Sequence, residues 1–567
     1  MSKILYVIYR TPNQKRIEDD KNLFLSIEKE LNPKNITPNP MNLYQTINSL
    51  GGVFNPVSTI EVCGSSVCMG YSPNKKKFEL GIRSEDIEGT YSIYRNTPSV
   101  FEIVTDMVGS RSVWYYADGE IFVSSSSQRA IIMYLGSFVF NKSVIPWMLT
   151  NGNIGPFYSY DTRLKLLHPN VLLRLDKYSW DVSIRENTIS LSSKYRTKKE
   201  FKKDLRHSIE LTFKKLNLDM NKFVLPLSGG YDSRVIFYFL KKFGLKTVTW
   251  GNQEAVEEKN NDAYVATNLA KKYGVEHSFF DSASCVEECA VVFERFFLCG
   301  EGRIDHIGGY LDAMNMWGRM FQHGVESIIR GDELLGLTAD KVMVDIRASE
   351  GLLLLKDFMN IAHLNEQFSI EEQKLPIFPY KGNNKFVLKG YMAFLYEHPI
   401  IFSALSDIKL SYVEIVNPLL SKDILYLIKE AFSKKNLGDK KLFKQIVNEY
   451  FQNYPIASKG ANVSVSEWLR TEKVVSEFLE CFQTVSEEDA LSPEFVSYVE
   501  TKITTKRKVK TSTLSMLPLS IKKIGKLLYR KRIIDWNVLA FRTYLLINMK
   551  RIFDNDSLIR KKYHIHK

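Results

Sequence analysis

The sequence predicts an α/β protein in which a strand-rich front domain precedes a doubly wound parallel sheet. Up to about Ser193 the chain is rich in short apolar runs broken by turn residues, as in antiparallel sheets. From about Lys199 strand-like and helix-like segments alternate, which is typical of a parallel sheet covered by helices. A chain of 567 residues is also long enough for about two to four domains.

The front domain, which we assign to residues 1–195, contains several expected β-strands. They are short and rich in aromatic and β-branched residues. We expect strands at Ile4–Tyr9, Tyr91–Tyr94, Val113–Tyr116, Ile121–Val123 and Val171–Leu175. The polar and basic segment from Lys194 to Lys203 is interpreted as the linker to the next domain.

The second domain, residues 196–510, shows the strand and helix alternation. Its expected elements are a buried strand Phe223–Leu227, a helix Val235–Phe243, a strand Thr247–Trp250, a helix Asn261–Tyr273 and a strand Ser327–Ile329. Parallel sheets of this kind bind ligands at the carboxyl ends of their strands. We therefore look for functional residues directly after the expected strands.

The clearest motif, Leu227–Arg234 (LSGGYDSR), lies between the first of these strands and its helix. Its two glycines let the backbone approach an anion closely, and the following helix N-terminus presents partial positive charge. Ser228 and Ser233 add hydroxyl donors. Asp232 suits a phosphate site only if Mg²⁺ bridges the carboxylate and the phosphate. The motif is neither a Walker A loop nor a dinucleotide-binding fingerprint.

Two segments compete as the second acidic motif. Arg330–Gly336 (RGDELLG) directly follows the expected strand at Ser327–Ile329 and supplies Asp332. The segment Gly300–Tyr310 (GEGRIDHIGGY) supplies Asp305, but no apolar strand precedes it. We favour Asp332, because a carboxylate at a strand end would lie near Asp232.

These motifs resemble those of the asparagine synthetase family. Leu227–Arg234 resembles the Ser-Gly-Gly-x-Asp-Ser pyrophosphate loop of the ATP pyrophosphatases, and Arg330–Gly336 resembles the family's Gly-x-Asp-Glu-x-x-Gly motif. Val413–Leu420 resembles its Val-Glu-x-x-x-Pro-Phe-Leu segment. Asp439–Lys444 resembles its Lys-x-Leu-Leu-Arg segment, which makes Lys440 the counterpart of the family's catalytic lysine, with Lys441 as the second choice.

The resemblance implies an adenine nucleotide alpha hydrolase-like domain that uses ATP and Mg²⁺. It implies that Asp232 and Asp332 hold the metal and that Lys440 stabilises the charge that develops on the transferred group. We expect the nucleotide to contact residues at the strand ends and the phosphate loop. These are Leu227, Ser228, Gly229, Gly230, Asp232, Ser233, Trp250, Gly251 and Gly331.

The front domain resembles the class II glutamine amidotransferase domains through Thr105–Ala117 and Asp118–Ser126. This resemblance implies an Ntn-type αββα sandwich. Glutamine hydrolysis in that family needs an amino-terminal Cys as the nucleophile, whereas this chain has Ser2 followed by Lys3. We therefore expect a degenerate domain that does not hydrolyse glutamine, with Ser2 as a nucleophile the weaker alternative.

The expected activity is that of an ATP-dependent, AMP- and pyrophosphate-forming amide-bond ligase that uses no glutamine. Its substrates would be small-molecule or peptide carboxylates and amines, as in the related β-lactam synthetases and lasso peptide cyclases. The base that deprotonates the amine is unassigned, because Ile329 stands where the family has Glu or Tyr. The alternatives are a catalytically inactive ATP-binding scaffold and an RNA-modifying relative of the ATP pyrophosphatases.

The C-terminal segment, residues 511–567, is interpreted as a basic amphipathic helical tail. From Thr501 to Lys567 there are 18 Lys or Arg residues and three Asp residues, a local net charge of 18 − 3 = +15, so the first 500 residues carry about −2 of the total of +13. A solvated helix is the simplest interpretation, followed by peripheral contact with the inner membrane face. Nucleic acid ranks third, because no nucleic-acid module accompanies the charge.

The sequence otherwise indicates a cytoplasmic protein. It has no signal peptide and no apolar run of the roughly 20 residues that cross a bilayer. The spacing of its six cysteines fits no zinc pattern, and we expect free thiols.

Overall fold

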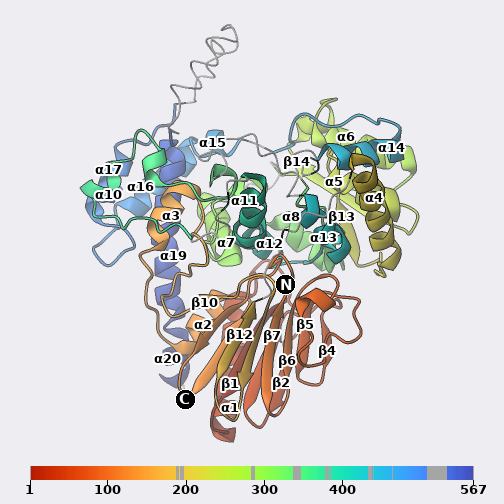
Figure 1. Cartoon of the computed structure of the whole chain (residues 1–567). Coiled ribbons are helices and arrows are strands. Elements are labelled where there is room, and N and C mark those ends of the chain that lie inside the picture. Colours follow the sequence, from red (N-terminus) through yellow and green to blue (C-terminus); the bar gives the residue numbers. More distant parts are fainter. Residues whose placement is uncertain are drawn as a thin grey trace.

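A computed structural model shows three β-sheets with helices packed around them (Figure 1). The structure describes residues 2–186, 191, 197–282, 288–335, 347–376, 382, 385–431, 437, 440–462, 464–506 and 533–565. Two sheets have six strands each and the third has five. The chain is therefore a mixed α/β protein, as the sequence predicted.

Both six-stranded sheets are antiparallel and belong to the front domain. The first has the order β10-β8-β9-β1-β3-β2, with β1 (Lys3–Tyr9), β2 (Asn42–Thr46), β3 (Ser49–Phe54), β8 (Trp114–Ala117), β9 (Ile121–Ser125) and β10 (Lys165–Leu166). The second has the order β12-β11-β7-β6-β5-β4, with β4 (Glu61–Cys63), β5 (Ser66–Tyr71), β6 (Thr90–Asn96), β7 (Val100–Thr105), β11 (Val171–Asp176) and β12 (Val182–Glu186). Every strand predicted for this domain is present.

The two front sheets stack face to face. Successive side chains of a strand point to opposite faces of its sheet, so one strand can contact the other sheet on one side and a helix on the other. In β1, Tyr6 packs with Tyr94 and Phe101 of the second sheet. The neighbouring Tyr9 belongs instead to the cluster that contains helices α1 (Gln14–Leu31) and α2 (Gln128–Leu135). One helical layer therefore covers the outer face of the first sheet.

The expected αββα arrangement is wrong in its fourth layer. The outer face of the second sheet is buried by Phe78 and Ile82 from the loop at 72–89, which also contains the short 3-10 turn η1 (Ser84–Asp86). Among the described residues, no α-helix contributes to this cluster. Gly81 in this loop has a φ of +77°, in the left-handed region that favours glycine.

The third sheet is parallel and has the order β15-β14-β13-β16-β17. Its strands are β13 (Phe223–Pro226), β14 (Lys246–Gly251), β15 (His277–Asp281), β16 (Ser327–Ile329) and β17 (Glu414–Val416). The chain runs outward from β13 to β15 and then returns to the other side of β13. The order therefore reverses between β13 and β16, which is where parallel sheets place their ligand crevice.

Helices cover both faces of the parallel sheet. One face packs against α4 (Lys198–Lys215), α5 (Asp232–Leu240), α6 (Asp262–Tyr273), α13 (Lys422–Ala431) and α14 (Lys441–Phe451). The other packs against α7 (Cys289–Gly300), α8 (Asn315–Gln322) and α12 (Ser403–Lys409). The predicted linker is wrong in its second half, because α4 begins at Lys198 behind a capping box formed by Thr197 and Glu200.

The remaining helices are short or lie at the junction of the two domains (Figure 1). They are α3 (Val144–Asn151), α10 (Leu364–Gln367), α11 (Lys385–Met392), the π-helix η5 (Ala393–Phe402), α15 (Val465–Trp468), α16 (Glu472–Phe482), α17 (Pro493–Glu500), α19 (Trp536–Asp556) and α20 (Ile559–Ile565). Four further 3-10 turns are η2 (Gln253–Val256), η3 (Ile307–Gly309), η4 (Leu355–Asp357) and η6 (Pro418–Leu420).

The structure changes the interpretation of the C-terminal tail. Helix α19 lies inside the main core, where it contacts α2, α3, α16 and α17. Its end is held by Asp556, which accepts hydrogen bonds from Arg129 Nε at 2.8 Å and Nη2 at 2.9 Å. The apolar side chains of α19 are therefore used by the fold. The predicted basic helix around Ile521–Arg530 lies outside the described residues.

No helix in the described part of the chain is long and apolar enough to cross a membrane.

Buried ion pairs connect the front domain to the rest of the chain. Lys3 Nζ lies 2.7 Å from Glu301 Oε1, and both side chains are almost fully buried. The Glu301 carboxylate also accepts hydrogen bonds from Ser127 Oγ and from Gln128 N. Arg111 pairs with Glu414 in the same way. These contacts fix the front domain against the end of α7 and against strand β17 of the parallel sheet.

We expect Glu301→Gln to lower the free energy of unfolding by about 3 kcal/mol, because it leaves the buried Lys3 ammonium without its counter-charge. Burial opposes ionisation of Glu301, but Lys3 holds its pKa below the ordinary value. A lowered folded pKa contributes stability above the unfolded pKa of about 4.3 that is lost as the pH falls. The difference between wild type and variant should therefore shrink in acid, as urea unfolding followed by tryptophan fluorescence would show.

The matched control is Glu294→Gln, which removes an exposed partner of Lys34. Exposed pairs contribute little, so this variant should unfold as the wild type does. Equal stability of wild type and Glu301→Gln at neutral pH would contradict the role of the buried pair.

Candidate functional site

The motif at 227–234 forms a tight turn between β13 and α5. Ser228 N donates to Ser233 Oγ at 3.0 Å, and Gly230 N donates to Ser228 Oγ at 3.2 Å. The two serine hydroxyl oxygens are 2.9 Å apart. The turn therefore places Ser228 and Ser233 together at the N-terminus of α5, where the helix dipole favours an anion.

Gly229 packs against the segment that follows α14. Its amide donates to Asp262 Oδ1 at 3.0 Å, and its carbonyl accepts from Ala457 N at 3.1 Å. A Cβ at this position would lie 2.3 Å from Ala457 Cβ. Arg234, which is 1% exposed, donates to the carbonyls of Gly229, Tyr454 and Pro455 and holds the two segments together.

Gly229→Ala is expected to lower the free energy of unfolding by about 1–3 kcal/mol, because the added methyl group forces Ala457 and the loop apart. Gly230→Ala is the control, since its Cβ would meet only Ser228 Oγ, at 3.3 Å. Chemical unfolding of the two variants measures the difference. Equal losses in both, or none in Gly229→Ala, would show that the close packing at Gly229 does not matter.

The second acidic motif directly contacts the first. Asp332 follows β16 and accepts hydrogen bonds from Arg330 Nη2 at 2.9 Å and Asn417 Nδ2 at 3.1 Å. A Cβ on Gly331 would lie 2.8 Å from the carbonyl carbon of Asp232. The structure therefore brings Asp232 and Asp332 to adjacent strand ends, as the sequence predicted.

The two carboxylates differ in their electrostatic surroundings. Burial raises the pKa of Asp232, and the charge of Asp332 raises it further, while Lys440 opposes the shift. Burial also disfavours the ionised form of Asp332, but the Arg330 guanidinium holds its pKa below the ordinary value. Asp332 is thus the more firmly ionised member of the pair.

Lys440 reaches into this group from the start of α14. Its Nζ lies 2.7 Å from Asp232 Oδ1 and 2.7 Å from Glu333 Oε1. Burial disfavours the ammonium, but the Glu333 and Asp232 carboxylates raise the pKa of Lys440 above its ordinary value. Lys440 is therefore the lysine placed in the site, and its neighbour Lys441 is exposed.

A cavity of about 290 Å³ lies at these strand ends. The predicted residues that line it are Leu227, Ser228, Asp232, Ser233, Trp250, Gly331 and Asp332. The other predicted residues lie beside it: Gly229 and Gly230 in the loop, Gly251 packed against Ala461, and Lys440 on Asp232. Gly336 and Asp439, which belong to the predicted motifs, lie outside the described residues.

Sequence reasoning missed four contributors to the site. Asp262 fixes the Gly229 amide, and Glu333 is the second partner of Lys440. Arg234 anchors the loop from behind, and the segment 460–462 lines the cavity. Glu333 and Arg234 lie within the two motifs and could have been considered, whereas the segment 460–462 (Gly-Ala-Asn) carries no recognisable signal.

The competing segment Gly300–Tyr310 lies elsewhere. Asp305 accepts from Arg542 Nε at 2.6 Å, and Glu301 is the buried partner of Lys3. Neither lines the cavity at the strand ends. Ile329 is buried in the core of the parallel sheet, so it offers no group to a substrate.

Ser2, the alternative nucleophile of the front domain, is buried and hydrogen-bonded. Ser2 is 3% exposed, and its hydroxyl donates to Asn55 O at 3.0 Å and accepts from Val57 N at 3.2 Å. The hydroxyl is thus used in the packing of the first sheet. Five cysteines are free thiols, as expected, and Cys285 lies outside the described residues.

The fold and the site define a mixed α/β protein whose parallel five-stranded sheet has a pocket with two carboxylates and a lysine at its carboxyl edge. No family model matches the sequence, and no curated protein matches it. Among solved structures, the chain is similar to glutamine phosphoribosylpyrophosphate amidotransferase from B. subtilis, complexed with ADP and GMP. The identity is 8% and the TM-score 0.21, over 57% of this chain and 90% of that one. At this TM-score the likeness does not establish a shared fold.

Proposed function

We propose that this chain is an ATP-dependent, AMP- and pyrophosphate-forming amide-bond ligase. The observation that carries the proposal is the convergence of the loop at 227–233, Asp332 and Lys440 on one pocket at the switch point of the parallel sheet. In this scheme a substrate carboxylate attacks the α-phosphorus of ATP and releases pyrophosphate. An amine then attacks the acyl-adenylate and releases AMP.

The residues present fit ATP and Mg²⁺. No three His, Cys, Asp or Glu side chains in the described chain are grouped to hold a metal alone. Asp232 and Asp332, at adjacent strand ends, would hold Mg²⁺ together with phosphate oxygens, since this hard cation prefers oxygen ligands. The loop serines and the α5 N-terminus would bind phosphate. Bound Mg²⁺ would neutralise charge on the departing pyrophosphate.

Lys440 would supply the fixed cation of the site. Its raised pKa keeps the ammonium protonated at neutral pH. Two carboxylates, Asp232 and Glu333, fix its position next to the loop before any substrate binds. A preorganised charge of this kind stabilises negative charge that develops in the transition state without reorganisation.

The amine would come from a substrate and not from glutamine. Ser2 is buried in the first sheet, and the Lys3–Glu301 pair fixes the same strand against the back of the molecule. We therefore propose that the front domain, whose two stacked sheets suit an Ntn-type ancestry, serves as a scaffold. By this proposal the chain would use an amine already present on a substrate, as the β-lactam synthetases and lasso peptide cyclases that it resembles in sequence motifs do.

The nucleotide products test this proposal. Purified protein is incubated with ATP, Mg²⁺ and fractionated cell extract, and the products are separated by anion-exchange chromatography. AMP and pyrophosphate in equal amounts, with no stimulation by added glutamine, are expected. ADP and phosphate as products would refute the proposal. Binding of ATP without turnover in any fraction would favour an inactive nucleotide-binding scaffold.

A further inference from the structure

Arg330 lines the cavity at the phosphate loop, and the proposed function gives it no role of its own. It directly follows β16, and its amide donates to Val416 O of the neighbouring strand β17 at 2.8 Å. Its side chain is 29% exposed. A guanidinium is therefore accessible from the same cavity as the serines of the loop and the two carboxylates of the acidic pair.

The fold uses few of the donors of this guanidinium. Nη2 donates to Asp332 Oδ1 at 2.9 Å, which is the one side-chain hydrogen bond of Arg330 to the part of the chain that the structure describes. The charge of Asp332 raises the pKa of Arg330, although burial opposes the charged form. Because an arginine carries several N–H donors, Nη1 is left to bind an acceptor in the cavity.

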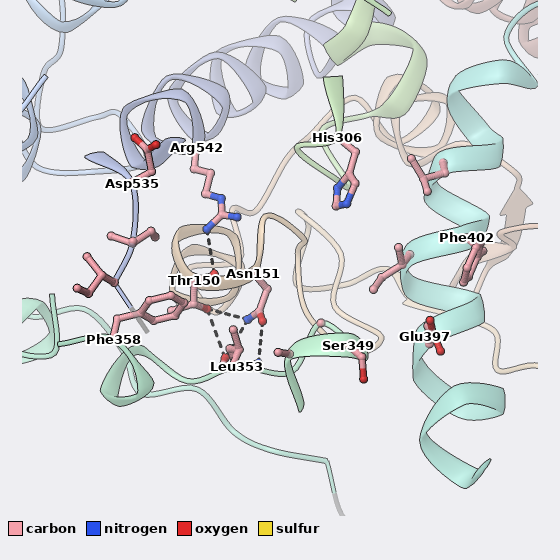
Figure 2. A pocket seen from close by; sticks show the side chains of 16 residues that line it. Thr150, Asn151, His306, Ser349, Leu353, Phe358, Glu397, Phe402, Asp535 and Arg542 are labelled. Carbon is pink, nitrogen blue, oxygen red and sulfur yellow. Dashed lines mark hydrogen bonds between the residues drawn. The ribbon is translucent and has the colours of Figure 1, made fainter. Parts of the chain in front are cut away.

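Arg542 shows the opposite case in a separate cavity, of about 790 Å³, which residues of both domains line (Figure 2). Its Nε donates to Asp305 Oδ2 at 2.6 Å, and its Nη1 donates to the carbonyls of Leu149 at 3.0 Å and Thr150 at 2.9 Å. These hydrogen bonds hold α19 against α3 and the segment that follows α7. Arg542 is thus used by the fold, whereas Arg330 gives a single hydrogen bond to a single side chain.

The carboxylates that line the cavity at the phosphate loop are Asp232, Asp262 and Asp332. Lys440 lies on Asp232, and Asp262 accepts from an amide of the loop. Neither of them is hydrogen-bonded to Arg330 in the described part of the chain. Asp332 is therefore the carboxylate that competes with a ligand for the guanidinium.

Asp332 does not cancel the charge of Arg330. The buried Lys409 lies near both members of the pair, and burial lowers its pKa to about 7. The charge of Arg330 lowers this pKa further, and does so by more than Asp332 raises it. The pair thus still presents positive charge on the side of Arg330, which favours an anion there.

Arg330 and the phosphate loop are close enough to share one ligand. The adjacent Gly331 packs on the loop, since a Cβ there would lie 2.8 Å from the carbonyl carbon of Asp232. The hydroxyls of Ser228 and Ser233, 2.9 Å apart, line the same cavity of about 290 Å³. The planar fork of an arginine matches the oxygens of a phosphate group.

We propose that Arg330 is a second anion-binding group of this cavity and binds one phosphate group of a ligand whose adjacent phosphate group lies at the loop. Asp332 and the phosphate are acceptors for the same guanidinium, so the carboxylate weakens the site for a metal-free anion. Removal of this carboxylate should therefore strengthen the binding of a diphosphate. That the ligand is ATP rests on the proposed function, whereas binding of a diphosphate does not.

Calorimetry of the full chain with inorganic pyrophosphate, in the presence of EDTA and without nucleotide, tests the proposal. Asp332→Asn should bind pyrophosphate at least about ten-fold more tightly than the wild type, as one charge-assisted hydrogen bond provides. The double variant Asp332→Asn/Arg330→Met should lose this gain. It removes both members of the ion pair and so leaves neither charge buried without its partner. Circular dichroism establishes that each variant is folded.

Three controls separate a direct contact from a general effect of charge. Asp219→Asn removes an exposed carboxylate of the same domain and should leave pyrophosphate binding unchanged. The gain in Asp332→Asn should persist in about 0.3 M NaCl, which screens exposed charges that are not in contact. Malonate, a dicarboxylate, should bind to Asp332→Asn at least about ten-fold more weakly than pyrophosphate does.

The proposal is overturned if Asp332→Asn shows no gain, or if the gain survives in the double variant or disappears in salt. Malonate that binds as tightly as pyrophosphate would also overturn it, because the site would then accept any dianion. If pyrophosphate binds as expected but the wild type forms no AMP, only the proposed function fails. If AMP forms and Arg330 has no effect on pyrophosphate binding, only this inference fails.

Discussion

An Asp232→Asn protein is expected to fold normally and to form AMP at least about 100-fold more slowly than the wild type. The substitution keeps the shape of the side chain but removes the carboxylate that we assign to the metal. It also removes one of the two negative charges that lie next to the Lys440 ammonium. Both effects weaken the stabilisation of charge on the transferred group. Initial rates of AMP formation measure the loss.

Asp219→Asn is the control for this prediction, because Asp219 is an exposed carboxylate of the same domain. It should form AMP at the wild-type rate. Circular dichroism and thermal unfolding establish that both variants are folded. AMP formation at the wild-type rate in Asp232→Asn would show that this carboxylate is not needed, and would contradict its assignment as a metal ligand.

Lys440→Met should lose activity to a similar extent and should also unfold more easily, by about 3 kcal/mol at neutral pH. The variant leaves Asp232 and Glu333 close together without the ammonium that lies 2.7 Å from each of them. Removal of one partner from a buried charge group costs several kcal/mol. Lys441→Met, which changes an exposed neighbour, should retain both activity and stability.

The same variant should show a pH dependence of stability with a definite sign. Burial raises the pKa of both Asp232 and Glu333, and Lys440 opposes the shift. Without Lys440 both pKa values rise further. The folded chain then holds protons that the unfolded chain releases above about pH 4, so the variant loses stability as the pH rises. The deficit relative to wild type should be larger at pH 8 than at pH 5, and an equal deficit would contradict the charge group.

The parallel sheet and the two motifs could be predicted because the information is local. Phe223–Leu227 is apolar, a glycine turn follows it, and a helix begins at Asp232. The strand Ser327–Ile329 has the predicted bounds and places Asp332 at its carboxyl end. The strand before Asp332 is the feature that distinguishes it from the competing Asp305, which no apolar strand precedes.

The predictions that were wrong concern features that depend on contacts between distant segments of the chain. The loop at 72–89 replaces a helical layer, although the strands beneath it have the expected pattern. Helix α19 carries basic residues that indicated a tail, yet Arg542 and Arg551 pair with Asp305 and Asp489 of other elements. The segment 460–462 is held at the pocket by contacts from distant segments: Asn252 N donates to Ala461 O at 2.9 Å, and Arg234 holds Pro455 just before it. Such partners cannot be identified from composition or periodicity.

Exchange of labelled pyrophosphate into ATP is the most direct test of the central claim, because it detects adenylation of a carboxylate without the amine. The purified chain is given ATP, Mg²⁺ and pooled metabolite and peptide carboxylates. The account predicts exchange that requires the carboxylate pool and disappears in Asp232→Asn and Lys440→Met. No exchange with any pool, in a protein that still binds ATP, would contradict it.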